Sequence, residues 1–376
     1  MPVKIVHCAD FHINSPMSSI SEKSDIRRDE VLMTLSSMVD ICISEDVQVL
    51  LIAGDFFDTP CVPDGVRKAV ETQLNRLSIP VFIAAGNHDY YTEFGAYANL
   101  NVSDNVHIFK GEPECVELSG LGVRVYGAGF TNSFADEPLM RKIEKPDDEL
   151  IDVVLLHGDV VTPGSTSQYN PISIGGIAES GADYCALGHI HMRSEISRCG
   201  NMSYAYPGCP EGRGFDETGE KGIYIGYIDK GKCELEFRRV CRRVYHDVEV
   251  NISECETADA ICDIVLNSLP GDGERDLYKI TLTGELPTDF EINIPVVENR
   301  LREKLYFAKV RNSTRIKLDL NMLRNEVSIR GYFVKDLYQK YEESLANGDR
   351  DEAEKYLRAI EYGIRAFEGE VNVFED

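Results

Sequence analysis

Residues 47–59 read VQVLLIAGDFFDT, and this stretch decides the fold class. Its first part, VQVLLIA, is mostly apolar and β-branched, which is typical of a strand buried on both faces of a parallel sheet. A polar motif, Gly54-Asp55-Phe56-Phe57-Asp58, follows directly. In α/β sheets, ligands bind beyond the carboxyl ends of the strands. The stretch therefore predicts a buried strand that presents Asp55, and after it Asp58, at the edge of the sheet where a ligand binds.

Four more polar motifs follow strand-like runs in the same way. They are Asp10-Phe11-His12, Gly86-Asn87-His88-Asp89, His157-Gly158-Asp159 and Gly188-His189-Ile190-His191. The runs before them read VKIVHC, PVFIAA, DVVLL and DYCAL. Strands that end at one edge would bring these Asp, Asn and His side chains together. The set holds more ligands than one ion needs, and it therefore predicts a dinuclear metal centre.

Such a centre has a well-defined chemistry. Asp, Asn and His are suitable ligands for manganese, iron and zinc. A carboxylate with one oxygen on each ion can bridge two ions about 3.5–4 Å apart, and the pair holds the attacking and leaving oxygens of a phosphoryl group. A histidine outside the ligand shell can protonate the leaving oxygen or stabilise developing charge. The motifs therefore favour hydrolysis of phosphate esters without a covalent intermediate.

The composition is typical of a soluble intracellular enzyme. A chain of 376 residues is long enough for two or three domains. Its beginning does not resemble a signal peptide, because Asp10 and His12 interrupt the apolar run, and no apolar stretch approaches the about 20 residues that span a bilayer. The 11 cysteines are scattered and form no CxxC pair, as expected of reduced thiols. We therefore expect a cytoplasmic protein without a membrane partner.

The patterns along the chain divide it into three parts. Residues 1–245 alternate strand-like and helical patterns and then become rich in strands. Residues 246–331 predict a compact βαβαβ unit. Residues 332–376 predict a helical tail, in which two helices meet at Asn347-Gly348. The apolar stripes of these two helices can pack on the rest of the protein or bind a partner.

The charge is unevenly distributed. The net charge of −25 argues mildly against a broad nucleic-acid-binding face. However, residues 300–330 hold nine Lys or Arg and three Asp or Glu, and residues 238–243 read RRVCRR. A solvated face is the ordinary interpretation of such runs, and a groove that follows phosphates is the alternative. The alternative requires a fold that brings the basic stretches near the metal centre.

The five motifs, in this order, resemble those of the calcineurin-like metallophosphoesterases. The segments IAGDFFDT, AAGNHD and ALGHIH, followed by YPG and GRGFDETGEKG, are most similar to the SbcD-type bacterial DNA repair exonucleases. The resemblance implies a two-sheet α/β/β/α metallophosphoesterase sandwich over residues 1–245. It also implies a small α/β capping domain over 246–331, whereas no family motif matches the C-terminal helical tail at 332–376.

The resemblance further implies the ligands and their roles. One metal ion would be held by Asp10, His12, Asp55 and His191. The second would be held by Asp55, Asn87, His157 and His189, so that Asp55 bridges the two. His88 would be the catalytic histidine that assists attack of the metal-bridged water, Asp58 would support it, and Arg213 would contact the phosphate. The two ions would be manganese, with iron and zinc as alternatives.

Three classes of function are open to this sequence. The first is a DNA repair exonuclease or endonuclease, and the second is a phosphatase or phosphodiesterase on a small-molecule or other non-DNA substrate. The third is a non-enzymatic scaffold, against which the complete ligand set argues. The basic unit after residue 245 favours the nuclease, because a small-molecule phosphatase has no obvious need for it. DNA and an SbcC-type ATPase that docks on the tail are then the expected partners, and a homodimer is a further candidate assembly.

Overall fold

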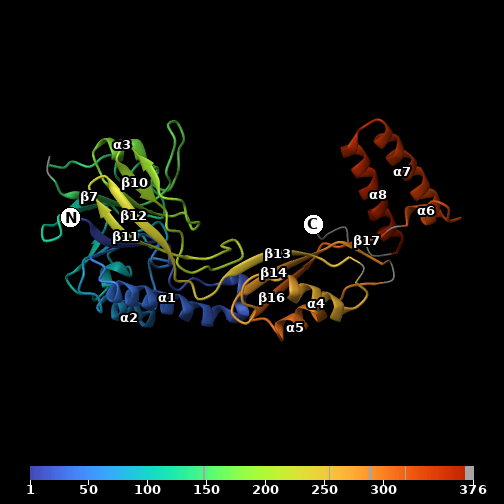
Figure 1. Ribbon diagram of the computed structural model, residues 1–376, viewed down its shortest axis with the longest axis horizontal. Coiled ribbons are helices and arrows are strands. Elements are labelled where there is room, and N and C mark those ends of the chain that lie inside the picture. The colour runs from blue at the N-terminus through green and yellow to red at the C-terminus, as the bar shows by residue number, and fades with distance from the viewer. Residues whose placement is uncertain (147–148, 254, 288–289, 318, 369–376) are drawn as a thin grey trace. The chain divides into compact units, whose positions relative to one another are not determined.

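The computed structural model describes residues 1–368 except 147–148, 254, 288–289 and 318. The chain forms two compact units (Figure 1). The first comprises Met1–His246 with Arg275–Leu277, and the second comprises Asp247–Glu274 with the chain from Tyr278 onward. The three-part division expected at residues 245 and 331 stays a prediction.

Two six-stranded sheets build the first unit. One has the order β12-β11-β1-β2-β3-β4, with β1 at Val3–Cys8, β2 at Val49–Ala53, β3 at Val81–Ala84, β4 at Val106–Phe109, β11 at Gly222–Asp229 and β12 at Lys232–Arg239. The other has the order β5-β6-β7-β8-β10-β9, with β5 at Glu114–Leu118, β6 at Val123–Gly127, β7 at Ile151–His157, β8 at Tyr184–Gly188, β9 at Ser197–Cys199 and β10 at Met202–Ala205. Strands β1 to β4 are parallel, and so are β6, β7, β8 and β10. Their carboxyl ends therefore share one edge in each sheet.

The two sheets pack face to face around one apolar core. Residues such as Ile5 and Leu51 of the first sheet share a buried cluster with Val125 and Leu155 of the second. The crossovers from β1 to β2 and from β2 to β3 contain α1 (Ser24–Ser44) and α2 (Asp64–Leu74). Right-handed crossovers put both helices on one face of the first sheet, and the second sheet covers the other face.

The outer face of the second sheet packs on α3 (Ile174–Glu179), whose Ile174 and Ile177 join a cluster with Val154 and Leu156. Two short 3₁₀ helices, Ser18–Lys23 and Tyr97–Asn99, complete the first unit. This arrangement of helices and sheets is the predicted α/β/β/α sandwich.

The second unit begins with the predicted βαβαβ order. It contains β13 (Tyr245–Asn251), α4 (Ala258–Ser268), β14 (Leu277–Thr283), α5 (Ile294–Arg302) and β16 (Phe307–Asn312), and the three strands form a sheet in the order β13-β14-β16. Both helices share an apolar core with this sheet. The short strands β15 (Glu285–Leu286) and β17 (Arg315–Ile316) pair in parallel beside this motif, which the sequence pattern did not predict.

Three helices end the described chain: α6 (Leu320–Leu323), α7 (Ile329–Ala346) and α8 (Arg350–Glu368). Helix α7 begins before residue 332 because the Ser328 side chain accepts a hydrogen bond from Gly331 N and caps the helix there. Gly348, with φ of 79°, makes the predicted turn between α7 and α8. Residues 369–376 of the predicted tail lie outside the described residues. Within the described chain, none of the helices is both long and apolar enough to span a membrane.

Candidate metal centre

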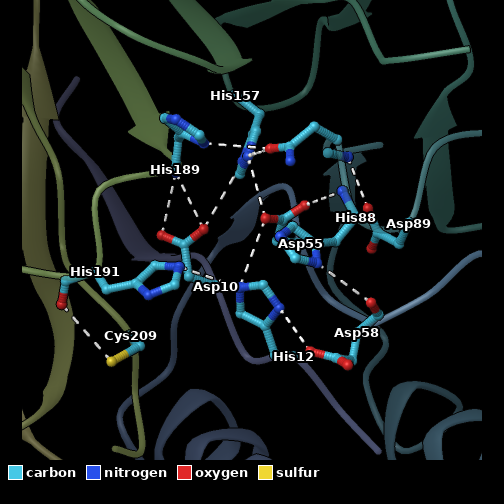
Figure 2. A network of polar contacts seen from close by, with 12 residues as sticks. Asp10, His12, Asp55, Asp58, His88, Asp89, His157, His189, His191 and Cys209 are labelled. Carbon is cyan, nitrogen blue, oxygen red and sulfur yellow. Dashed lines mark hydrogen bonds and ion pairs between the residues drawn. The ribbon is translucent and has the colours of Figure 1, made fainter. Parts of the chain in front are cut away.

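The predicted ligands lie where parallel strands end. Asp10 and His12 follow β1, Asp55 follows β2, Asn87 follows β3, His157 ends β7, and His189 and His191 follow β8. Several of these residues have left-handed backbone conformations, with φ of 55° at Asp10, 46° at His12, 46° at Asp55 and 107° at His189. Such conformations are costly for residues other than glycine and are concentrated at functional sites. Here they turn the chain sharply, so that the side chains of Asp10, His12 and Asp55 converge with His157 (Figure 2).

A first group of donors consists of Asp10, His12, Asp55 and His191, whose ligand atoms lie within 4.8 Å of one another. The Nε2 atoms of His12 and His191 are only 3.1 Å apart. Asp55 Oδ2 is 3.5 Å from His12 Nε2. All four side chains therefore face one point, and they are the residues that the family resemblance assigns to the first ion.

A second group consists of Asp55, His157 and His189, with ligand atoms again within 4.8 Å. Asn87 joins it, because its Oδ1 atom is 2.9 Å from His157 Nε2 and 3.2 Å from His189 Nδ1. Asp55 Oδ2 is 3.4 Å from His157 Nε2. The same Asp55 oxygen thus faces both groups.

Asp55 differs in one respect from the expected bridge. A carboxylate with one oxygen on each ion was expected, but Asp55 Oδ1 accepts a hydrogen bond of 2.9 Å from the backbone N–H of His88. Only Oδ2 faces the histidines of both groups. This bond also fixes the backbone of His88 against the shared carboxylate.

The donor chemistry fits two divalent cations. In the first group, two imidazole nitrogens approach each other at 3.1 Å inside a buried site. With the proton of each ring on Nδ1, beside Asp58 and Glu217, both Nε2 lone pairs face the same point, as a shared cation requires. The mixture of imidazole, carboxylate and amide donors suits manganese, iron and zinc. The assignment of each residue to one ion stays a prediction.

The buried carboxylates have opposite pKa shifts. Burial raises the pKa of Asp10 to about 6, although His157 and His191 oppose this effect. Burial also acts to raise the pKa of Asp55, but the nearby His157 and His12 bring it well below its usual range. Asp55 is therefore ionised at neutral pH, as a shared metal ligand must be.

The pKa values of the histidines in the site also differ. Burial lowers the pKa of His12 to about 4, although its hydrogen bond to Asp58 acts to raise it. Burial and the charge of His157 lower the pKa of His189 to about 4. Burial opposes protonation of His157 too, but Asp55 raises its pKa to about 9. His12 and His189 are thus neutral and ready to bind a cation, whereas His157 must release a proton first.

His88 and Asp58, the predicted catalytic pair, lie on the solvent side of the first group. The His88 ring is exposed and stands edge-on to the His12 ring, with 4.7 Å between the ring centroids. His88 Nδ1 is 3.4 Å from the backbone oxygen of Asp58. The Asp58 carboxylate is 3.2 Å from His12 Nδ1 and 3.3 Å from an Arg213 nitrogen. The Asp58 side chain therefore contacts His12, a predicted ligand, and its carboxylate lies within 4.8 Å of ring nitrogens of both His12 and His88.

Asp89 lies beneath this region and is fully buried. It accepts hydrogen bonds from Gly86 N at 2.7 Å, from Phe57 N at 2.9 Å and from the Tyr97 hydroxyl. Burial, with the charge of Asp55, raises its pKa to about 6. Asp89 thus joins the two loops that carry Asp55 and His88.

Sequence reasoning missed Glu217, which lies 2.7 Å from His191 Nδ1. It also treated Arg213 as a phosphate contact, but the Arg213 side chain is only 18% exposed and contacts Glu217 and Asp58. Both residues belong to the segment GRGFDETGEKG, which carried the family resemblance. The sequence around Glu217 gave no sign of this contact, because His191 follows β8 and lies far from Glu217 along the chain.

Asp159 and Tyr169 lie beside the His189 ring. Asp159 Oδ1 is 3.5 Å from His189 Nε2. The Tyr169 ring lies 4.9 Å from the His189 ring, centroid to centroid, and Tyr169 is 38% exposed. The site therefore has an aromatic group at its rim, which the sequence interpretation did not single out.

Three of the four arginines of RRVCRR form ion pairs with acids of the first unit, and Arg242 is exposed. Arg238 pairs with Glu45 at 2.6 Å, Arg239 with Glu220 at 3.0 Å, and Arg243 with Glu30 at 2.6 Å. These contacts support the ordinary interpretation of this run, a set of arginines used within the protein's own fold, rather than a groove that follows phosphates.

Comparison with known proteins identifies the family. The sequence profile of the calcineurin-like phosphoesterases matches residues 3–193. The chain belongs to the calcineurin-like phosphoesterase family, and it is a metal-dependent hydrolase.

Three relatives place it within that family. The chain is 27% identical over 296 residues to the uncharacterized metallophosphoesterase YhaO of Bacillus subtilis, and the match covers 75% of this chain and 72% of the relative. It is 26% identical over 263 residues to the DNA double-strand break repair protein Mre11 of Methanopyrus kandleri, covering 63% of this chain and 57% of the relative. It is 26% identical over 259 residues to the SbcD component of the SbcCD nuclease of Bacillus subtilis, covering 58% of this chain and 64% of the relative. The chain thus spans less than two thirds of the length of these last two relatives.

Proposed function

We propose that this protein is a two-metal phosphodiesterase that cleaves DNA in repair. The observation that carries the proposal is the pair of donor groups that share Asp55 Oδ2, with the exposed His88 ring beside them. Two divalent ions held by these groups, manganese in our proposal, would supply Lewis-acid activation and neutralise the charge of the phosphate. Relatives named as a nuclease and a double-strand break repair protein support DNA as the substrate.

His88 is suited to move a proton at the reacting phosphate. Its backbone N–H is fixed on Asp55 Oδ1, and its Nδ1 atom faces the carbonyl oxygen of Asp58 at 3.4 Å. Because a carbonyl can only accept, this contact favours a proton on Nδ1 and directs Nε2 away from it. We propose that His88 Nε2 donates a proton to the leaving oxygen or stabilises charge on the phosphate.

The rim of the site supports a substrate with a base. Tyr169 presents a partly exposed ring beside His189, and Met192, next to His191, is 74% exposed. Aromatic groups beside a phosphate site stack on nucleobases without strong sequence preference. A phosphate monoester without an aromatic group would leave this surface in water.

The second unit offers a further basis for DNA binding. Lys309 and Arg311 are exposed and lie two residues apart on β16, so they share one face of the strand. Arg300 and Arg302 are less suitable, since Arg300 pairs with Asp259 and Arg302 packs on the Phe307 ring. We expect charge reversal at Lys309 and Arg311 to weaken DNA binding and to reduce its salt dependence, while hydrolysis of a small phosphodiester is retained.

The decisive experiment compares substrates. Purified protein with manganese is assayed on labelled single- and double-stranded DNA, beside bis-p-nitrophenyl phosphate. We expect both DNA and the small phosphodiester to be cleaved, and DNA binding to weaken steeply with salt. Hydrolysis of bis-p-nitrophenyl phosphate with intact DNA would refute the nuclease and favour a phosphodiesterase for smaller substrates. A protein that binds two ions and cleaves neither would be a scaffold.

We also propose that the helical tail binds an SbcC-type ATPase in the cytoplasm. Tyr332 in the first turn of α7 is 70% exposed, and next to the predicted tail Ile329, the first residue of α7, and Val327, which precedes the helix, are 79% and 93% exposed. Apolar side chains gathered at such exposure are typical of a protein interface. Replacement of Ile329 and Tyr332 by Asp should abolish co-purification with a co-expressed ATPase of this type, whereas Gln339→Glu on the same helix should not. If the double variant is a monomer and the wild type a dimer, this surface forms a homodimer instead.

A further inference from the structure

Two carboxylates lie behind the histidines of the first donor group, and one guanidinium joins them. His191 Nδ1 is 2.7 Å from Glu217 Oε1, and His12 Nδ1 is 3.2 Å from Asp58 Oδ1. Arg213 reaches Glu217 Oε1 with one terminal nitrogen at 2.8 Å and Asp58 Oδ1 with the other at 3.3 Å. Each of the two rings is therefore fixed from behind by a carboxylate, and the two carboxylates are fixed to each other.

The second donor group is held differently. His157 Nδ1 lies 2.9 Å from the backbone oxygen of Ala53, a neutral acceptor. His189 Nε2 is 3.5 Å from Asp159 Oδ1, longer than a normal hydrogen bond to a carboxylate. The nearest carboxylate oxygen to His157 Nδ1, Asp10 Oδ1, is 3.8 Å away. The two groups thus differ in how closely a carboxylate approaches the imidazoles from behind.

The tautomer of His191 follows from its surroundings. Its Nε2 atom faces His12 Nε2 within the first donor group, so a lone pair is needed there. The proton then lies on Nδ1 and is donated to Glu217 Oε1. Arg213 is also close to Nδ1, at 3.0 Å, but the contact with Glu217 is shorter, and the guanidinium has acceptors in Glu217 and Asp58. A carboxylate in this position fixes the ring and makes it a stronger donor.

The loop that carries Glu217 is itself fixed to α1. Arg27, which is fully buried, donates to Glu211 Oε1 at 2.6 Å and to the backbone oxygen of Gly212 at 2.9 Å. Glu217 Oε2 accepts the backbone N–H of Arg213 at 2.8 Å. The backbone of Arg213 thus holds the Glu217 carboxylate, and Arg27 of α1 holds the loop at Glu211 and Gly212.

We propose that Glu217, anchored by Arg213, is a positioning residue that fixes His191 and so sets the affinity of the first ion relative to the second. The inference rests on the proposed two-ion function and deepens it. Removal of such a carboxylate usually weakens metal binding by about 10–100-fold. The Glu217 carboxylate contacts His191 of the first donor group and Arg213 beside it. His157 and His189 of the second group have other partners. Loss of Glu217 should therefore weaken the binding of one ion only.

The test uses a graded series in the full-length protein: Glu217→Gln, which keeps an acceptor for His191 without the charge, and Glu217→Ala, which removes both. Asp216→Asn is the matched control, since it removes the same charge from the same loop one residue away. Manganese binding is followed by isothermal titration calorimetry, and the magnetic coupling of the two ions by electron paramagnetic resonance. The melting temperature of the metal-free protein shows whether each variant is folded.

We expect one of the two binding steps to weaken by about 10–100-fold in Glu217→Ala and by less in Glu217→Gln, with loss of the coupled signal and the other step unchanged. Asp216→Asn should match the wild type. Should Glu217→Ala not fold, Arg213→Met leaves Glu217 in place and should weaken the same step. Folded variants that bind both ions like the wild type would overturn the inference. A wild type that binds no pair of ions would overturn the proposed function, and this inference with it.

Discussion

Gly188, at the end of β8, lies against the ends of β1 and β2 in the first sheet. A Cβ atom at this position would lie 1.7 Å from the backbone oxygen of Ala53 and 2.9 Å from the Cβ atom of Ala9. Ala9 and Ala53 stand at the ends of β1 and β2, directly before Asp10 and the Gly54-Asp55 turn. Gly188→Ala therefore tests whether close packing of the sheets sets the geometry of the site.

The cost follows from the atoms that a methyl group would meet. Ordinary contact needs more than 3 Å, so the 1.7 Å approach requires a backbone shift of more than about 1 Å in a packed core. Overpacking costs typically 1–3 kcal/mol, and here the obstacle is a backbone atom that cannot rotate away. We expect a loss of about 3 kcal/mol in the free energy of unfolding, together with displacement of His189 and His191 from Asp55.

The measurement is urea unfolding of the metal-free protein, followed by manganese titration of the folded fraction. Gly175→Ala is the control, because a Cβ at Gly175 in α3 meets nothing within 4 Å. That control should be neutral or more stable by up to about 1 kcal/mol. If Gly188→Ala unfolds within about 0.5 kcal/mol of the wild type and binds two ions normally, the reasoning about sheet contact is refuted.

Three further predictions concern the reaction. Asp55→Ala should lose both ions and nearly all activity, because the same oxygen faces both donor groups; elemental analysis showing two retained ions would contradict this. His88→Ala should keep both ions and lose turnover by about 10²–10⁴-fold, the usual contribution of a positioned acid or base, and an unchanged kcat would exclude that role. If the Tyr169 ring stacks on a base, Tyr169→Ala should raise KM for an oligonucleotide but not for the same oligonucleotide with an abasic site at the cleaved position. Tyr169→Phe keeps the ring and should resemble the wild type. Equal effects of Tyr169→Ala on both substrates would argue against stacking.

Local sequence patterns predicted the buried strands and the polar motifs that follow them, and the family resemblance added the two-sheet sandwich. The strands VQVLLIA and DVVLL are apolar along their whole length because both faces of each sheet are covered, and this burial is visible in the sequence without knowledge of the partner. The motifs at their ends needed one further rule, that parallel strands present their carboxyl ends at one edge. Asp10 and Asp55, which follow neighbouring parallel strands of one sheet, were placed together on that basis.

The pairing of charged groups could not be predicted in the same way. The supporting role expected of Asp58 stays a prediction, whereas the contact of its carboxylate with His12, 46 residues away along the chain, was not predicted. Arg238 pairs with Glu45 at the C-terminal end of α1, and Arg243 pairs with Glu30 within α1. No local pattern connects these residues. An ion pair depends on which surfaces packing brings together, and the same arginine could as well have remained in solvent.

By itself, then, the sequence determined the fold class, the strand ends and the identity of the converging side chains, because burial and chain direction are encoded residue by residue. Only the tertiary structure decided which oxygen of Asp55 faces both histidine groups, and which groups stand behind those histidines. Glu217 illustrates the reason, since it lies 26 residues from His191 along the chain and yet 2.7 Å away in space. A hydrogen bond of that length depends on how a loop, a helix and two sheets pack together, and no short stretch of sequence contains that information.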